Sequence, residues 1–216
     1  MQDIIQQICI WALPILFAIT LHEAAHGYVA HKLGDHTAYL LGRVSANPLK
    51  HIDPLGTILI PLIMMLTTNF IFGWAKPVPV DGRNLKHPRR DFAWVAMAGP
   101  TSNFLMALFW AGVMKLGLYL IAHKVTLGTP MALMGKAGIM INLVLMVLNL
   151  IPLPPLDGSR VLSALLPPKL DILFNKITPF GFIILILLAV MGVLSKILLP
   201  PVQWLLSLIV MLFQLS

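Results

Sequence analysis

Six long apolar stretches, separated by charged residues and by proline or glycine, constrain this chain more than any other feature of its sequence. They cover residues 4–31, 55–72, 92–122, 131–152, 177–199 and 201–215, each end being placed to within a few residues. A helix that crosses a bilayer needs about 20 predominantly apolar residues, and most of the stretches reach that length. Hydrophobic residues make up 58% of the chain and charged residues 11%, whereas about a quarter of an ordinary soluble domain is charged. The sequence therefore predicts an all-α polytopic membrane protein.

Most of the 15 lysines and arginines lie in three polar stretches between the apolar ones, at residues 31–53, 76–91 and 157–176. Cytoplasmic loops of membrane proteins carry an excess of Lys and Arg, so we expect all three stretches to face the cytoplasm of a cell membrane. The first helix would then run inward from an N-terminus on the outside. No basic stretch is interleaved with exposed aromatic residues, so the net charge of +7 does not indicate a nucleic-acid partner.

The second apolar stretch, residues 55–72, conflicts with this orientation if it crosses the membrane. Its two basic neighbours would then lie on opposite sides. It has Pro61 in its middle and is only about 18 residues long. Backbone that enters the membrane and returns is tolerated where it is buried in protein or lines a cavity, so we expect a re-entrant segment here.

The first apolar stretch contains the sequence HEAAH, in which Glu23, the only glutamate of the chain, lies between His22 and His26. Residues four apart project from one face of a helix, so the two imidazoles can share one zinc ion. Glu23, about 100° round the helix from His22, can reach a water molecule bound to the metal. Zinc lowers the pKa of such a water to about 7. Alternatively, the histidines are polar residues at a helix end near the interface. Ionisable groups inside a membrane segment are costly and usually functional, which favours the metal site.

A catalytic zinc needs a third protein ligand and one open position. Most aspartates of the chain lie in charged loops or beside turns, where a solvated or capping role explains them. Asp157 differs, because it follows an apolar run that Pro152, Pro154 and Pro155 break. Asp157 is therefore the candidate third ligand. Asn149, shortly before it, either donates to an oxyanion formed at a carbonyl or satisfies backbone that the prolines leave unpaired.

This assignment makes a topological demand, because the two halves of the site must lie on the same side of the membrane. With residues 92–122 running outward and 131–152 running inward, Asp157 follows an inward-running helix, as the histidine pair requires. The stretch 55–72 must then not span the membrane, which agrees with the charge argument.

Three motifs make the chain resemble the site-2 protease family of intramembrane zinc metalloproteases. They are HEAAH at 22–26, AGPTSN at 98–103 and NLIPLPPLDG at 149–158, and they occur in the family's order. The resemblance covers about residues 15–165. The chain resembles a compact bacterial or archaeal type of member, because no segment is long and polar enough for a PDZ or CBS module.

The resemblance implies one Zn²⁺ per chain, with His22, His26 and Asp157 as ligands, Glu23 as general base and Asn149 as a residue that orients the substrate or oxyanion. It implies an endopeptidase of the regulated intramembrane proteolysis type, which cleaves within or beside a transmembrane segment. The expected partners are a transmembrane protein substrate and the lipid bilayer. The site would lie toward the cytoplasmic side of the membrane.

The stretch FGWAKPVPVDG at 72–82 is similar to a membrane-associated β-hairpin that follows the catalytic helix in this family. Its alternating valines and Asp-Gly turn suit a short hairpin, and its alternative is a proline-rich loop. The expected fold is thus about five transmembrane helices plus a re-entrant segment and this short hairpin. We expect one membrane-embedded domain over residues 1–216, with a catalytic core at about 4–165 and C-terminal helices at about 177–215.

Two other functions are compatible with the same residues. A zinc transporter also needs intramembrane His and Asp residues, but it gives no reason for a glutamate between the histidines, and transport usually needs ligands at several depths. A relative that binds membrane segments without cleaving them is the other alternative, although the motif residues are intact.

Overall fold

The computed structural model describes residues 2–59 and 76–215, and all regular secondary structure among them is helical. The long helices are α1 (Gln2–Lys32), α4 (Pro88–Ala122), α5 (Gly128–Leu150), α8 (Thr178–Val190) and α9 (Val193–Phe213). The short elements are α2 (Thr37–Leu40), α6 (Asp157–Leu165), α7 (Pro168–Asn175), the 3₁₀ turns η1 (Pro48–Lys50) and η3 (Gly82–Asn84), and the π-helical turn η2 (Pro54–Leu59). The prediction of an all-α protein is confirmed.

Four helices, namely α1 from Ile5, α4, α5 and α9, are long and apolar enough to cross a membrane. A fifth span results if α7 and α8, which are bent by 61° relative to each other, count as one broken crossing. This agrees with the expected number and describes a multi-pass membrane protein. Of the predicted re-entrant segment at 55–72, only the part within η2 belongs to the described residues, and the rest lies outside them.

The boundary that we expected between the last two apolar stretches, 177–199 and 201–215, is wrong. Prolines at 200 and 201 suggested it, because proline removes a helical hydrogen bond. In the structure both prolines lie inside α9, and the break falls at Gly192. Gly192 has a φ of +70°, a left-handed conformation that glycine adopts without steric cost. Proline is tolerated inside membrane helices because neighbouring groups and local adjustments satisfy the freed carbonyls.

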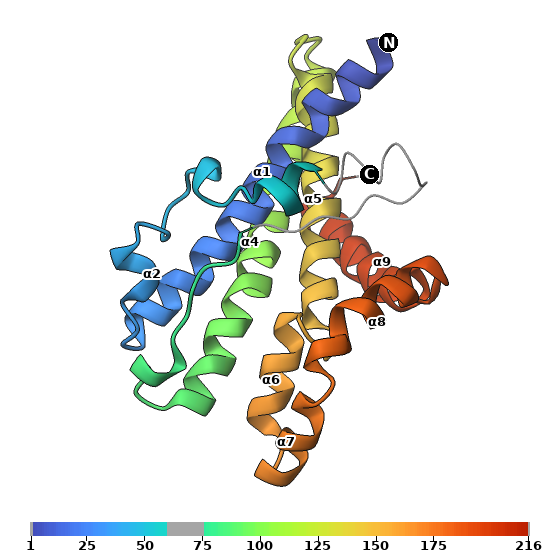
Figure 1. The fold of residues 1–216 in the computed structure, drawn as a ribbon. Coiled ribbons are helices and arrows are strands. Elements are labelled where there is room, and N and C mark those ends of the chain that lie inside the picture. Colours follow the sequence, from blue (N-terminus) through green and yellow to red (C-terminus); the bar gives the residue numbers. More distant parts are fainter. Residues whose placement is uncertain (1, 60–75, 216) are drawn as a thin grey trace.

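The centre of the molecule is the antiparallel pair α4 and α5, with α1 packed along both (Figure 1). Their close contact uses small residues: a Cβ at Gly138 of α5 would lie 2.1 Å from the Trp110 ring of α4. Ile139 packs in the same buried cluster, which α9 completes with Val202 and Ile209. In a membrane the hydrophobic effect does not favour helix–helix contact over helix–lipid contact. Small residues let helix backbones approach closely, and the resulting van der Waals packing holds the helices together.

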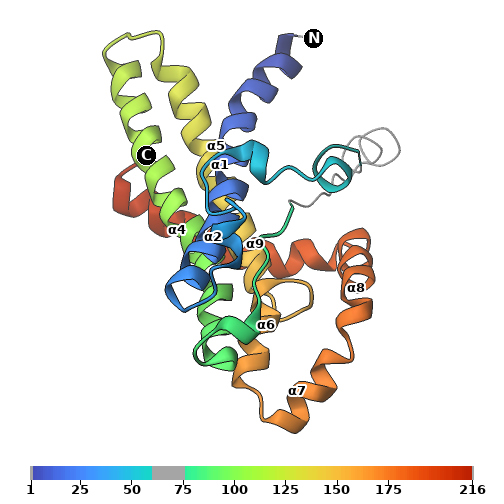
Figure 2. The same cartoon turned by 60° about the vertical axis from the view of Figure 1, so that its left-hand side comes forward.

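Helices α1 and α5 run in the same direction, opposite to α4 (Figures 1 and 2). α5 ends at Leu150, just before the prolines, as the sequence predicted, and a further helix, α6, begins at Asp157. A Cβ at Gly158 would lie only 2.3 Å from the Leu150 oxygen, so a glycine lets the first turn of α6 lie against the end of α5. The fold thereby carries Asp157 to the half of α1 that contains the histidines, which meets the topological demand.

Residues 76–81, which we call the strap, form an extended segment beside α1. Val78 of the strap is buried, and a Cβ at Gly27 of α1 would lie 3.1 Å from its Cγ1. No strand occurs in the described residues of the expected hairpin, which turns into η3 at Gly82, and residues 72–75 of that hairpin lie outside the described part.

Candidate metal centre

Three predicted ligand residues meet at one point between α1 and α6. The Nε2 atoms of His22 and His26 are 3.1 Å apart. The Oδ2 atom of Asp157 lies 3.2 Å from the first and 3.3 Å from the second. Both histidines are buried, with 8% and 9% of their surface exposed. Residues 131 positions apart in the chain, His26 and Asp157, are thus in direct contact.

The second ring nitrogen of His26 fixes where its hydrogen lies. Nδ1 of His26 is 2.7 Å from the backbone oxygen of Val95 in α4. A carbonyl oxygen only accepts hydrogen bonds, so Nδ1 carries the hydrogen, and Nε2 of the neutral ring presents a lone pair. His26 therefore faces the centre of the site as an acceptor.

An amide network fixes His22 in the same way. The fully buried Asn103 of α4 donates from Nδ2 to the Ala18 oxygen (3.1 Å) and to Oδ1 of Asn142 (3.0 Å). Its Oδ1 therefore faces Nδ1 of His22, 2.6 Å away, and accepts a hydrogen bond from it. Asn142, also fully buried, donates in turn to the Gly138 oxygen of α5. His22, like His26, thus directs a lone pair at Asp157.

With both rings neutral and Asp157 ionised, the three atoms at the centre of the site are all acceptors. The Asp157 Oδ2 atom is buried without a hydrogen-bond partner in the described part of the chain. Repulsion between such close acceptors is removed by a cation. The donor set of two imidazoles and one carboxylate suits zinc. Ligand atoms at about 2.0–2.1 Å in tetrahedral directions lie about 3.3 Å apart, which matches the observed separations.

Helix α4 lies against the two imidazoles at Gly99. A Cβ there would be 2.5 Å from Cε1 of His22 and equally close to Nε2 of His26, so any larger residue would displace the rings. Gly99 and Asn103 belong to the AGPTSN motif, from which no role for either residue was predicted, and Asn142 lies outside every predicted motif. A detectable signal existed, because Asn103 and Asn142 are amides within long apolar helices, where polar groups usually hydrogen-bond across helices.

The Glu23 carboxylate faces the strap. Its Oε2 accepts a hydrogen bond of 2.8 Å from the backbone nitrogen of Val78. Glu23 directly follows His22 in α1, and its role as general base stays a prediction.

Asn149 makes a local contact. Its Nδ2 donates to the Leu145 oxygen, one turn back in α5, at 3.0 Å. The prolines do not leave the Leu145 oxygen without a donor. The first of them, Pro152, lacks the N–H group that would donate to the Leu148 oxygen in a continued helix. A role for Asn149 at an oxyanion stays a prediction.

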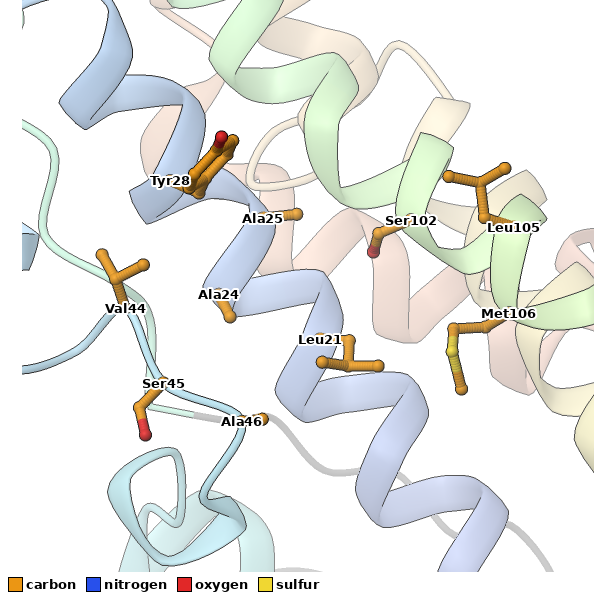
Figure 3. Close-up of a pocket in the computed structure, with 10 residues that line it drawn as sticks. All are labelled: Leu21, Ala24, Ala25, Tyr28, Val44, Ser45, Ala46, Ser102, Leu105 and Met106. Atoms are coloured by element: carbon orange, nitrogen blue, oxygen red, sulfur yellow. The ribbon is translucent and has the colours of Figure 1, made fainter. Parts of the chain in front are cut away.

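An apolar groove of about 420 Å³ lies on a different side of α1 (Figure 3). Leu21 and Ala25 line it from α1, Ser102 and Met106 from α4, and residues 44–46 form its other wall. Glu23 points about 160° away from Leu21 and Ala25 round the helix. His22, Glu23, His26 and Asp157 are not among the residues that line the groove.

The chain is similar in sequence to bacterial proteins that are named as zinc metalloproteases. The chain is 38% identical over 196 residues to YwhC of Bacillus subtilis, covering 87% of this chain and 83% of that protein. It is 27% identical over 190 residues to Rip2 of Mycolicibacterium smegmatis (88% and 70%) and over 193 residues to Rip2 of Mycobacterium tuberculosis H37Rv (89% and 71%). Each relative is named as a zinc metalloprotease, an assignment that its name marks as provisional. No family model and no solved structure matches the chain.

Proposed function

This chain belongs to the site-2 protease family of zinc metalloproteases, and from that premise we propose that it is an intramembrane endopeptidase. Its substrates would be membrane proteins, and it would hydrolyse peptide bonds within or beside their transmembrane segments, as in regulated intramembrane proteolysis. The position of the site supports this proposal, because His22, Glu23 and His26 all lie in the part of α1 that is long and apolar enough to span a membrane.

The observation that carries the proposal is the cluster of three acceptors. The Nε2 atoms of His22 and His26 and Oδ2 of Asp157 lie within 3.3 Å of one another. In the neutral rings the Nδ1 atoms carry the hydrogens, so the cluster suits a cation. We infer that it binds one zinc ion per chain.

Zinc bound there supplies a Lewis acid that polarises a carbonyl and makes water acidic enough to lose a proton near neutral pH. His22, His26 and Asp157 would hold it, and the contacts of the two Nδ1 atoms keep both rings in the ligating tautomer. Glu23 would take a proton from the attacking water as general base and then donate it to the leaving amine as general acid.

The substrate must expose its scissile bond, because the backbone of an intact transmembrane helix is closed by its own hydrogen bonds. We therefore expect a preference for helices that unwind locally. The three basic stretches of the sequence support an active site that opens toward the cytoplasmic side of the cell membrane.

A cleavage assay tests the function. Purified wild-type protein with zinc, mixed with a single-span test substrate in liposomes, should yield products whose new termini map by mass spectrometry within or beside the span. Glu23→Gln should retain zinc and yield no product. Full activity of this variant, or cleavage confined to a soluble part of the substrate, would overturn the proposal.

Zinc transport fits the described residues less well. Within them, His22, His26 and Asp157 form the one group of three side chains close enough to share a metal, whereas a transport pathway usually needs ligands at several depths. Zinc flux into liposomes that survives Glu23→Gln would favour transport over proteolysis.

A further inference from the structure

The sequence of the strap leaves one backbone donor at the place where Glu23 needs one. Pro77 and Pro79 have no N–H group, so Val78 supplies the only amide hydrogen in this triplet. That hydrogen is donated to Oε2 of Glu23 over 2.8 Å. A hydrogen bond to an ionised carboxylate is shorter and about twice as strong as one between neutral groups.

The strap is tethered on both sides of this contact. On one side, the Lys76 nitrogen donates to the His51 oxygen, and Arg43 donates from Nη2 to the Lys76 oxygen, each at 2.9 Å. On the other side, the Asp81 nitrogen donates to Oδ2 of the buried Asp35 at 2.7 Å. These contacts come from segments that follow α1 in the chain, so the strap is fixed to the helix that carries the site.

Side-chain packing sets the depth of the strap on α1. Val78 is 8% exposed, and a Cβ at Gly27, one turn beyond Glu23, would lie 3.1 Å from Cγ1 of Val78 and 3.0 Å from Cγ2 of Val44. The absence of a side chain at Gly27 therefore lets the Val78 backbone come within hydrogen-bond reach of the carboxylate.

We propose that the Val78 amide is a positioning group for Glu23, and this inference rests on the proposed role of Glu23 as general base. The terminal torsion of a glutamate is broad, so a free carboxylate samples many orientations. The amide holds Oε2 and leaves Oε1 as the oxygen that accepts the proton. Since a misplacement of about 1 Å can cost a factor of about 100 in rate, anchoring one oxygen acts on kcat.

Replacing Val78 by proline removes the hydrogen, exchanges the buried side chain, and places Cδ where the hydrogen pointed at Oε2 of Glu23. Val78 already lies between two prolines, and the residue before a proline is restricted to extended conformations that proline also adopts. Val78→Ala is the matched control, because it keeps the amide and shortens the side chain. Both variants lose the valine side chain, so we expect the kcat of Val78→Pro to be about 10-fold to 100-fold below that of Val78→Ala, with equal KM and zinc content in the two. Equal kcat values in the two variants would overturn the inference.

A second measurement tests the contact without using cleavage. Amide hydrogen exchange, read at single-residue resolution, should be slow at Val78 in the wild type and about 10-fold or more faster in Glu23→Ala, which has no acceptor. Glu23→Gln keeps a neutral acceptor oxygen, whose hydrogen bond is weaker, so its exchange rate should lie between those of the wild type and Glu23→Ala. Unchanged exchange in Glu23→Ala would overturn the positioning role even if the protein is an active protease. Faster exchange together with an inactive wild type would support the contact and contradict the proposed function instead.

Discussion

Nδ1 of His22 lies 2.6 Å from Oδ1 of Asn103, and the amide of Asn103 is itself held by a backbone oxygen of α1 and by Asn142 of α5. One buried side chain of α4 thus joins the three central helices and determines which nitrogen of His22 faces Asp157. The tautomer of the histidine follows from helix packing.

Asn103→Ala should weaken zinc binding. It removes the acceptor for Nδ1 of His22, so the ring loses both its orientation and its tautomer preference, and loss of such outer partners typically costs 10-fold to 100-fold in metal affinity. Competition with a zinc chelator measures the change. Asn175→Ala is the control, because in the described part of the chain the Asn175 amide hydrogen-bonds to Asp171 and Ser163, near α7 and away from the metal centre. Equal zinc affinity in the two variants would show that Asn103 does not support the site.

Gly99→Ala should abolish zinc binding while leaving the helices formed. The added Cβ would be 2.5 Å from atoms of both imidazoles, far inside normal contact distance, so the rings or α4 must move. Gly112→Ala is a control in the same helix, since a Cβ at Gly112 meets nothing within 4 Å. It should stabilise α4 slightly, because alanine has about 1 kcal/mol better helix propensity than glycine. The zinc content of both variants measures binding, and circular dichroism measures their helix content. Normal zinc content in Gly99→Ala would contradict the close contact between Gly99 and the imidazoles.

Asp35 should stabilise the folded protein in a pH-dependent way. Burial alone would raise the pKa of Asp35, but hydrogen bonds from Thr37, Asn84 and the Asp81 nitrogen outweigh it and lower that pKa. A carboxyl whose pKa is lower in the folded state stabilises the protein fully above its unfolded value, about 3.9, and loses this effect as the pH falls through the folded value.

Asp35→Asn should therefore lower the free energy of unfolding on the order of 2 kcal/mol at pH 7 and by much less at pH 3. Thermal unfolding of the detergent-solubilised protein at the two pH values measures the difference. Asp81→Asn provides the contrast, because the Asp81 carboxylate pairs with the exposed Arg83, and such pairs contribute little to stability. An equal loss for Asp35→Asn at both pH values would exclude a role for its ionisation.

The proposed orientation predicts which loops are accessible from outside the cell. In a Cys9→Ser background, a cysteine at Lys124, between α4 and α5, should react with a membrane-impermeant thiol reagent on intact cells. A cysteine at Arg83, in η3, should react only after the cells are permeabilised. The reverse pattern would place the metal centre on the outer side.

The parts of the site that could be predicted are those with a local chemical signal. The spacing of His22 and His26 places both on one helix face whatever surrounds them, and the prolines end α5 before Asp157 by removing backbone donors. These signals were enough to anticipate that the three side chains meet.

The supporting contacts depend on tertiary packing, which periodicity does not reveal. The contacts of Asn103 with His22 and of Gly99 with the imidazoles exist only because α4 lies against α1 at one register. The same limit explains the misplaced boundary near α9: two prolines are the stronger local signal, yet the helix axis breaks where Gly192 adopts a left-handed conformation. The Val78 amide was also unforeseen, since only the folded strap brings it to Glu23.

The central claim is that His22, His26 and Asp157 hold one zinc ion while Glu23 does not ligate it. The most direct measurement is the zinc content per chain of purified wild type, Glu23→Gln and Asp157→Ala, each checked for unchanged helix content. We expect about one zinc per chain in the first two and little or none in Asp157→Ala. A full complement of zinc in Asp157→Ala, or its loss in Glu23→Gln, would contradict this claim.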